Sequence, residues 1–340
     1  MSALPLISVI LPVHNAAATV RAAVDSLDAE SVSQVEVVAV DDGSTDASAA
    51  LLDDMAQTRP WLRVLHAPHR GIAPALNAGI GVARGELIAR MDADDRSLPG
   101  RLERQRRFLL DHHSIGLVSG RVRFGGDPHR ARGYAHYVSW INSLRDPADI
   151  AAMRFVESPF AHPAVMFRAN LVRLHGGYRD GAFPEDYELW LRWMDQGVRM
   201  ASIPDEVLLW SDPPDRLSRT DARYSIDAFY MMKAEYIARW AVRRVRSWPQ
   251  VYFWGAGRTT RKRAQYLIAH GAQVRAWVDI DVKKIGHRVW GAPVIAAEEL
   301  PPPGECFIFP FVGSRSARAD IMRWLEERGY VLERDYVPVA

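Results

Sequence analysis

The stretch IARMDADDRSLPGRLERQ, residues 88–105, decides how this chain folds and raises a question about charge. Its first residues continue an apolar run from residue 86 that is typical of a buried strand. Asp92, Asp94 and Asp95 follow at once, although like charges repel and carboxylates resist removal from water. A solvated turn or a bound divalent cation would offset that cost. The stretch therefore predicts a strand that delivers an acidic group to the edge of a sheet.

Strands and helices alternate on the N-terminal side of this stretch. Short β-branched runs predict buried strands over residues 7–12, 35–40, 62–66 and 86–91. Helical spacing and caps predict helices over residues 16–27, 44–56, 71–83 and 98–112. The alternation is typical of a mostly parallel sheet with helices on both faces. Ligands of such sheets lie beyond the carboxyl ends of the strands, where Asp41, Asp42 and the Asp92 group are expected.

The rest of the chain predicts two further parts. The middle is less regular, with a strand over 115–120, a helix over 187–195 and a long helix over 225–246. From residue 249 a smaller α/β unit is expected, with strands over 251–254, 274–278 and 306–311. We therefore expect a large α/β domain over 1–225, a connecting helix over 226–248 and a small α/β domain over 249–340.

Composition narrows the possible partners. The 340 residues are 48% hydrophobic with a net charge of +2, which allows a large core and does not favour nucleic acid. Cys306 is the single cysteine, so a reducing compartment is expected. We expect no signal peptide and no membrane span, hence a cytoplasmic protein, because no run of about 18 apolar residues occurs. The basic stretch 240–248, flanked by tryptophans, predicts either peripheral contact with an anionic membrane or a solvated connector.

The acidic stretch itself has two interpretations. If the chain is extended there, Asp92 and Asp94 point to the same side, which suits Mg²⁺ or Mn²⁺ held against a diphosphate. Alternatively, the acids form a solvated turn that caps the helix at Arg101.

Several motifs in order favour the cation. ISVILPVHN (7–15), VDDGSTD (40–46), ALNAGI (75–80) and ARGE (83–86) before DADD (92–95) together resemble the inverting family 2 glycosyltransferases of GT-A fold, over about residues 5–220. The resemblance implies that Asp41 hydrogen-bonds a base, usually a pyrimidine, and that Asp94 binds the metal that bridges the diphosphate. It places the donor pocket at Pro12, His14, Asn15, Asp41, Asp42, Asn77, Asp92 and Ala93.

The same resemblance assigns catalytic residues. Asp186, in the PEDYELW motif, would be the base that takes the proton of the acceptor hydroxyl, with Glu185 beside it. Asp186 could instead only cap a helix. His162 is expected near the metal, with Asp92 and Asp94, although a structural hydrogen-bonding role stays open. Arg216 would close over the diphosphate, but Trp-Ser-Asp at 210–212 replaces the usual Tyr-Arg-x-His pattern of the family.

The C-terminal part carries a weaker motif. Gly255-Ala256-Gly257 follows a strand and opens a helix, and Asp279 ends the next strand, as in nucleotide-binding turns. Thr260 stands where a third glycine is usual. This part resembles the small Rossmann-like domain in front of some sugar acyltransferases, which can hold a nucleotide-sugar. A degenerate unit used for packing, dimer contacts or acceptor positioning is the alternative.

The expected function is metal-dependent inverting transfer of a sugar from a nucleoside-diphosphate sugar, with UDP-sugar as the expected donor. The acceptor would be a hydroxyl of a cell-surface glycan or a lipid-linked intermediate in polysaccharide biosynthesis. A nucleotidyltransferase is disfavoured because PVHNAA (12–17) lacks a glycine-rich basic loop. A non-catalytic sugar-nucleotide-binding protein and an NAD(P)-dependent oxidoreductase acting through the C-terminal domain remain alternatives.

Overall fold

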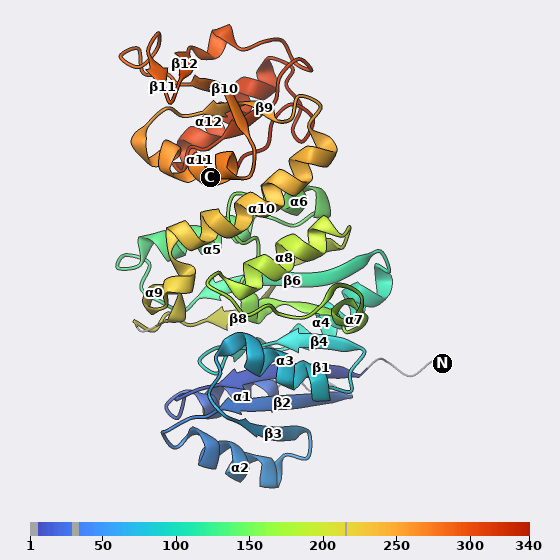
Figure 1. The fold of residues 1–340 in the computed structure, drawn as a ribbon. Coiled ribbons are helices and arrows are strands. Elements are labelled where there is room, and N and C mark those ends of the chain that lie inside the picture. The colour runs from blue at the N-terminus through green and yellow to red at the C-terminus, as the bar shows by residue number, and fades with distance from the viewer. Residues whose placement is uncertain (1–5, 29–33, 215) are drawn as a thin grey trace. The chain divides into compact units, whose positions relative to one another are not determined.

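The computed structural model describes residues 6–28, 34–214 and 216–340, which form two compact units (Figure 1). The first unit holds the described residues up to Ile150, with Pro159–Gly181 and Glu185–Thr220. The second holds Ala151–Ser158, Ala182–Pro184 and Asp221–Ala340. The expected domain limits at residues 225 and 248 stay a prediction.

The first unit is built on an eight-stranded sheet in the order β3-β2-β1-β4-β7-β6-β8-β5. Its strands are β1 (Ile7–Val13), β2 (Val35–Asp42), β3 (Leu62–Ala67), β4 (Leu87–Arg90), β5 (Arg96–Ser97), β6 (Ile115–Phe124), β7 (Met166–Arg168) and β8 (Arg199–Trp210). The four strands predicted first, β1 to β4, are parallel to their neighbours among themselves. Strand β7 runs antiparallel to both β4 and β6, so the sheet is mixed beyond β4.

Several helices pack on this sheet through an apolar stripe. In α1 (Val20–Asp28), for example, Val20, Ala23, Val24 and Leu27 are buried at helical spacing in the sheet's core. The helices up to residue 220 are α1, α2 (Ser48–Thr58), α3 (Ile72–Val82), α4 (Arg101–Asp111), α5 (Arg132–Ile141), α6 (Pro147–Met153), α7 (Asn170–His175), α8 (Glu185–Asp195) and α9 (Leu217–Thr220). A mixed α/β fold of the expected class is therefore confirmed.

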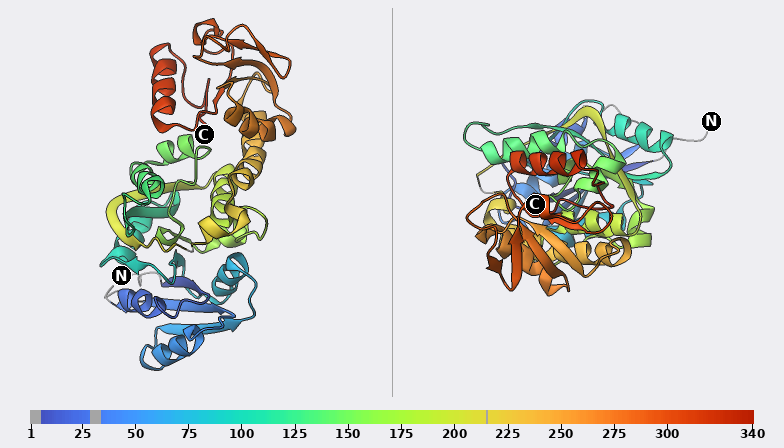
Figure 2. Two further views of the ribbon diagram at one scale, coloured as in Figure 1. Left: turned by 90° about the vertical axis from the view of Figure 1, so that its left-hand side faces the viewer. Right: turned by 90° about the horizontal axis from the view of Figure 1, so that it is seen from above.

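The second unit contains the smaller sheet that the sequence predicts. Its order is β11-β12-β10-β9-β13, and every pairing is parallel except β11 with β12. The strands are β9 (Gln250–Trp254), β10 (Gln273–Val278), β11 (Arg288–Val289), β12 (Ala292–Ile295) and β13 (Ile308–Pro310). The helices are α10 (Ile226–Arg244), α11 (Arg258–Ala269) and α12 (Arg315–Glu327). Helix α12, red in Figure 2, packs Ile321 and Leu325 along one side of the sheet.

The core of the second unit limits one expectation. Trp240 on α10 is 9% exposed and packs against Phe155 and Phe307, with ring centroids 6.0 and 5.7 Å away. Its ring is therefore not available to a membrane surface. Within the described residues, no helix combines the length and apolarity needed to cross a bilayer.

Candidate active site

The acidic cluster, defined as Asp92, Asp94 and Asp95, follows the end of β4. The chain forms a turn there rather than an extended segment, since the Asp95 amide donates to the Asp92 carbonyl at 3.3 Å. One carboxylate oxygen from each acid lies within 4.8 Å of the others. Asp95 is 1% exposed, and its Oδ2 has no hydrogen-bond donor among the described residues. An all-oxygen donor set with a buried free oxygen fits a hard divalent cation.

Burial sets the charge of this cluster. Burial and the Asp92 carboxylate raise the pKa of Asp94 to about 6. Burial and both neighbouring acids raise the pKa of Asp95 well above its usual range. Full ionisation of the cluster is therefore costly, and a bound cation would offset that cost.

A buried arginine, Arg90, contacts the acidic cluster. Arg90, the last residue of β4, is 2% exposed and forms an ion pair with Asp92. Its carbonyl accepts from Arg101 Nη2 at 2.7 Å, which ties α4 to the strand end. Sequence reasoning did not single out Arg90, although an arginine inside an apolar strand is the signal that could have revealed it.

The loop after β8 also contacts the acidic cluster. Ser211 donates its amide to Asp95 Oδ1 at 2.7 Å and its hydroxyl to the Asp94 carbonyl at 2.6 Å. Arg216 lies over the Trp210 ring, 4.4 Å from the centroid, and pairs with buried Asp212 at 3.3 Å. Its charge acts to lower the pKa of Asp94. A stacked, ion-paired arginine thus faces the acids where the family's usual pattern is missing.

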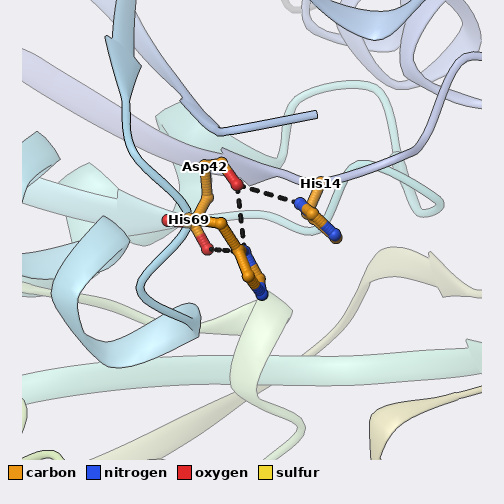
Figure 3. A group of neighbouring side chains, drawn as sticks. All are labelled: His14, Asp42 and His69. Atoms are coloured by element: carbon orange, nitrogen blue, oxygen red, sulfur yellow. Dashed lines mark hydrogen bonds and ion pairs between the residues drawn. The ribbon is translucent and has the colours of Figure 1, made fainter. Parts of the chain in front are cut away.

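A second group lies at the carboxyl ends of β1 and β2 (Figure 3). The rings of His14 and His69 stack with centroids 4.1 Å apart, and both Nδ1 atoms approach the Asp42 carbonyl, at 2.9 and 3.0 Å. The Asp42 carboxylate accepts from the amides of Arg70 and Gly71, both at 2.9 Å. Because these donors occupy the carboxylate, we interpret the group as a hydrogen-bonded platform of two flat rings. Sequence reasoning missed His69, which no local pattern marks.

The remaining donor-pocket predictions fall in different surroundings. Asp41 is 4% exposed, accepts from the Ser44 amide at 3.1 Å and lies 3.3 Å from His66 Nδ1. Asn15 Oδ1 accepts from the Thr45 amide at 2.8 Å. Pro12 lies within β1 beside Val40, and Ala93 lies in the acidic turn.

Asn77 on α3 faces the loop before α8. Its Nδ2 donates to the Tyr178 carbonyl at 2.8 Å, and its Oδ1 accepts from the Tyr178 amide at 3.0 Å. Both polar atoms of the Asn77 side chain are therefore hydrogen-bonded to the backbone of the loop before α8, in the first unit.

Two carboxylates open α8. Glu185 is 2% exposed, and burial together with Glu185 raises the pKa of Asp186 to about 7. A carboxylate with such a pKa is matched to accept a proton near neutral pH. His162, 8% exposed, lies beside this pair, since its Nδ1 is 3.7 Å from Glu185 Oε1. Its Nε2 contacts the Tyr178 hydroxyl at 2.7 Å, so both ring nitrogens face groups outside the acidic cluster.

The glycine turn of the second unit holds its own acid. The Ala256 amide donates to Asp279 Oδ2 at 2.9 Å, and Lys284 Nζ lies 3.1 Å from the same oxygen. The carboxylate of Asp279, which in a nucleotide-binding turn could reach a ribose, is therefore already bonded within the unit. The resemblance to acyltransferase domains stays an expectation.

Known proteins have sequences similar to this chain. A sequence model of the family described as glycosyl transferase family 2 matches residues 8–174. The glycosyltransferase EpsE of Bacillus subtilis (strain 168) is 30% identical over 234 residues, which are 67% of this chain and 80% of EpsE. The amylovoran biosynthesis glycosyltransferase AmsE of Erwinia amylovora is 32% identical over 54% of this chain and 67% of its own length.

Solved structures share the fold. TarS of S. aureus, in complex with UDP-GlcNAc, aligns with a TM-score of 0.56 and 17% identity over 78% of this chain and 71% of that chain. The mannosyltransferase PcManGT from Pyrobaculum calidifontis, in complex with GDP-Man and Mn²⁺, aligns with a TM-score of 0.51 and 21% identity, over 80% and 70%. Together with the motifs and the relatives, this establishes that the chain belongs to glycosyl transferase family 2 and is a glycosyltransferase of GT-A fold.

Proposed function

We propose that this glycosyltransferase moves a sugar, with inversion, from a nucleoside-diphosphate sugar to a hydroxyl of a growing glycan or lipid-linked acceptor. The observation that carries the proposal is the combination of an acidic cluster with a second carboxylate pair, buried Glu185 and partly buried Asp186, at the start of α8 in the same unit. The relative AmsE is named for amylovoran biosynthesis, which supports a role in polysaccharide biosynthesis.

The donor is proposed to be a UDP-sugar. The stacked rings of His14 and His69 offer a flat surface on which a base can lie, at the strand ends where nucleotides bind in this fold class. Similar folds hold UDP-GlcNAc in one case and GDP-Man in another, so the base is the part of the proposal that most needs a test.

Mg²⁺ or Mn²⁺ is proposed as the cofactor, held by Asp94 and Asp92 with Asp95 supporting the site. Such a cation would offset the charge of the departing diphosphate. The Mn²⁺ in a protein of similar fold agrees with this choice of metal. Arg216, already desolvated against Trp210, adds a second positive charge on that side.

The chain's own residues would carry the proton. Asp186 takes the proton of the acceptor hydroxyl as that oxygen attacks the anomeric carbon from the face opposite the diphosphate. The bond from the anomeric carbon to the diphosphate oxygen breaks, and its electron pair leaves with the diphosphate. One displacement inverts the configuration, so the mechanism needs no covalent glycosyl-enzyme.

Calorimetric titration with UDP, with and without Mn²⁺, tests this function. Metal-dependent UDP binding that is lost in Asp94→Ala would support it, and donor sugars can then be screened with Asp186→Asn as the inactive control. Binding that ignores both the metal and Asp94 would point to a site elsewhere in the chain. If UDP does not bind, the same titration with GDP and dTDP decides whether only the base is wrong. Full UDP binding with unimpaired transfer by Asp186→Asn would refute the catalytic assignment.

A further inference from the structure

Two buried side chains beside α8 take no part in the mechanism above. His162 precedes β7, and Tyr178 lies in the loop between α7 and α8. They are 8% and 5% exposed, and 2.7 Å separates His162 Nε2 from the Tyr178 hydroxyl. A hydrogen bond between buried groups is costly to leave unmade, so these two side chains fix each other's orientation.

The tyrosine is held from a distant part of the sequence. Asn77 on α3 makes two hydrogen bonds to the backbone of Tyr178, at 2.8 and 3.0 Å. Gly177 leaves room for this clamp, because a Cβ there would lie 2.5 Å from Asn77 Oδ1. The backbone of Tyr178 is therefore anchored to α3, in the first unit.

His162, which contacts the Tyr178 hydroxyl, also contacts two residues of α8. Its Nδ1 lies 3.7 Å from Glu185 Oε1, and its ring packs edge-on against fully buried Trp190, with centroids 5.9 Å apart. Burial and the charge of Arg90 hold the pKa of His162 well below its usual range, so the ring is neutral. A neutral imidazole has one donor and one acceptor nitrogen.

The two neighbours of the ring favour one tautomer. With the proton on Nδ1, the N–H bond faces the Glu185 carboxylate at 3.7 Å, an electrostatic attraction longer than a hydrogen bond, and Nε2 accepts from the Tyr178 hydroxyl. With the proton on Nε2, a lone pair would face the carboxylate at Nδ1. The surroundings therefore favour the Nδ1–H form.

We propose that Tyr178 and His162 are positioning residues for the glycosyl transfer, which hold Glu185 and thereby the start of α8 that carries Asp186. This assignment rests on the proposed function, and it replaces the expected role of His162 as a metal ligand. The chain from Asn77 through Tyr178 and His162 would keep the base aligned with the donor half of the site. A network of this kind acts on turnover rather than on metal or donor binding.

Kinetics of two single variants and their combination test the assignment. Tyr178→Phe removes only the hydroxyl, and His162→Gln removes the Nδ1 donor. We expect each to lower kcat by about tenfold to a hundredfold, with donor KM and Mn²⁺ affinity changed by less than about twofold. The double variant should be no slower than the slower single variant, because both interrupt one chain. Thr58→Val, which loses a hydroxyl at the end of α2 in the same unit, is the control for folding and should leave kcat unchanged.

Two results would overturn the assignment. If His162→Gln weakens Mn²⁺ binding as Asp94→Asn does, the histidine is a metal ligand. If both variants keep the wild-type kcat, the chain has no role in turnover.

A spectroscopic measurement separates this proposal from the proposed function. ¹⁵N NMR of histidine-labelled protein reports the tautomer of His162, whose signal is the one absent in His162→Gln. A neutral Nδ1–H ring that changes in Tyr178→Phe would support the network even if no donor is found. A Nε2–H or charged ring would refute the network even in an active enzyme.

Discussion

The dependence of the rate on pH tests the assignment of Asp186 most directly. Burial and Glu185 raise the pKa of Asp186 to about 7, and a general base must be ionised before it can accept a proton. The ionised fraction would rise from about one tenth at about pH 6 to about nine tenths at about pH 8. We therefore expect kcat/KM to rise about tenfold over that range and then to level off.

The assay is the initial rate of transfer at low donor concentration and saturating Mn²⁺, with metal saturation checked separately at each pH. Asp186→Asn should lose the rising limb together with about 10²- to 10⁴-fold of the rate. Asp195→Asn, an acid at the other end of α8, should keep both. A flat profile in the wild type, or an unchanged rising limb in Asp186→Asn, would show that Asp186 is not the base.

Three further outcomes are expected. The affinity for Mn²⁺ should fall as the pH falls through about 6, where Asp94 gains its proton. Binding of Mn²⁺ should therefore release protons, which calorimetry in buffers of different ionisation enthalpy measures. Asp186→Asn should raise the melting temperature above pH 7 and much less near pH 4, measured by calorimetry. The pKa of Asp186 is raised from 3.8 to about 7, so folding keeps a proton that the unfolded chain releases, and wild-type stability falls as the pH rises between those values. Lys233→Met should lower the free energy of unfolding of the second unit by about 1–3 kcal/mol, measured by urea denaturation. The buried Lys233 amine donates to the carbonyls of Phe155, Val156 and Val339, which the variant leaves without a donor. Lys262→Met, at an exposed site, is the control and should not change the free energy of unfolding.

Local pattern was enough to predict the part of the fold that positions the donor. Strands β1, β2 and β4 are short, apolar and buried along almost their whole length, so each is recognised from its own sequence. The acidic cluster follows from β4 because three carboxylates after a buried strand need a special reason.

The middle of the sheet was harder to predict because its strands carry no such pattern. Strand β8 has twelve residues, but exposed Pro204 and Asp205 interrupt its apolar alternation. Strand β7 has only three residues and runs against its neighbours. Neither hydrophobic period nor turn chemistry marks such segments, since tertiary contacts determine them.

The side chains missed in the site have the same explanation. The ring of His69 stacks on that of His14, although the two residues follow different strands. The Tyr178 hydroxyl contacts His162, although it comes from the loop before α8. Sequence spacing predicts neighbours within one helix or strand, whereas these pairs depend on topology.

The charges around the acidic cluster explain how three neighbouring carboxylates are tolerated at the end of a buried strand. Buried Arg90 pairs with one acid, and the raised pKa values of Asp94 and Asp95 show that burial and mutual repulsion make full ionisation of the cluster costly. A donor diphosphate would add further negative charge to the same edge, where Arg216 is already paired with Asp212. Binding of the donor alone would therefore work against repulsion, while a divalent cation removes that repulsion. We conclude that metal and donor should bind with strong positive coupling.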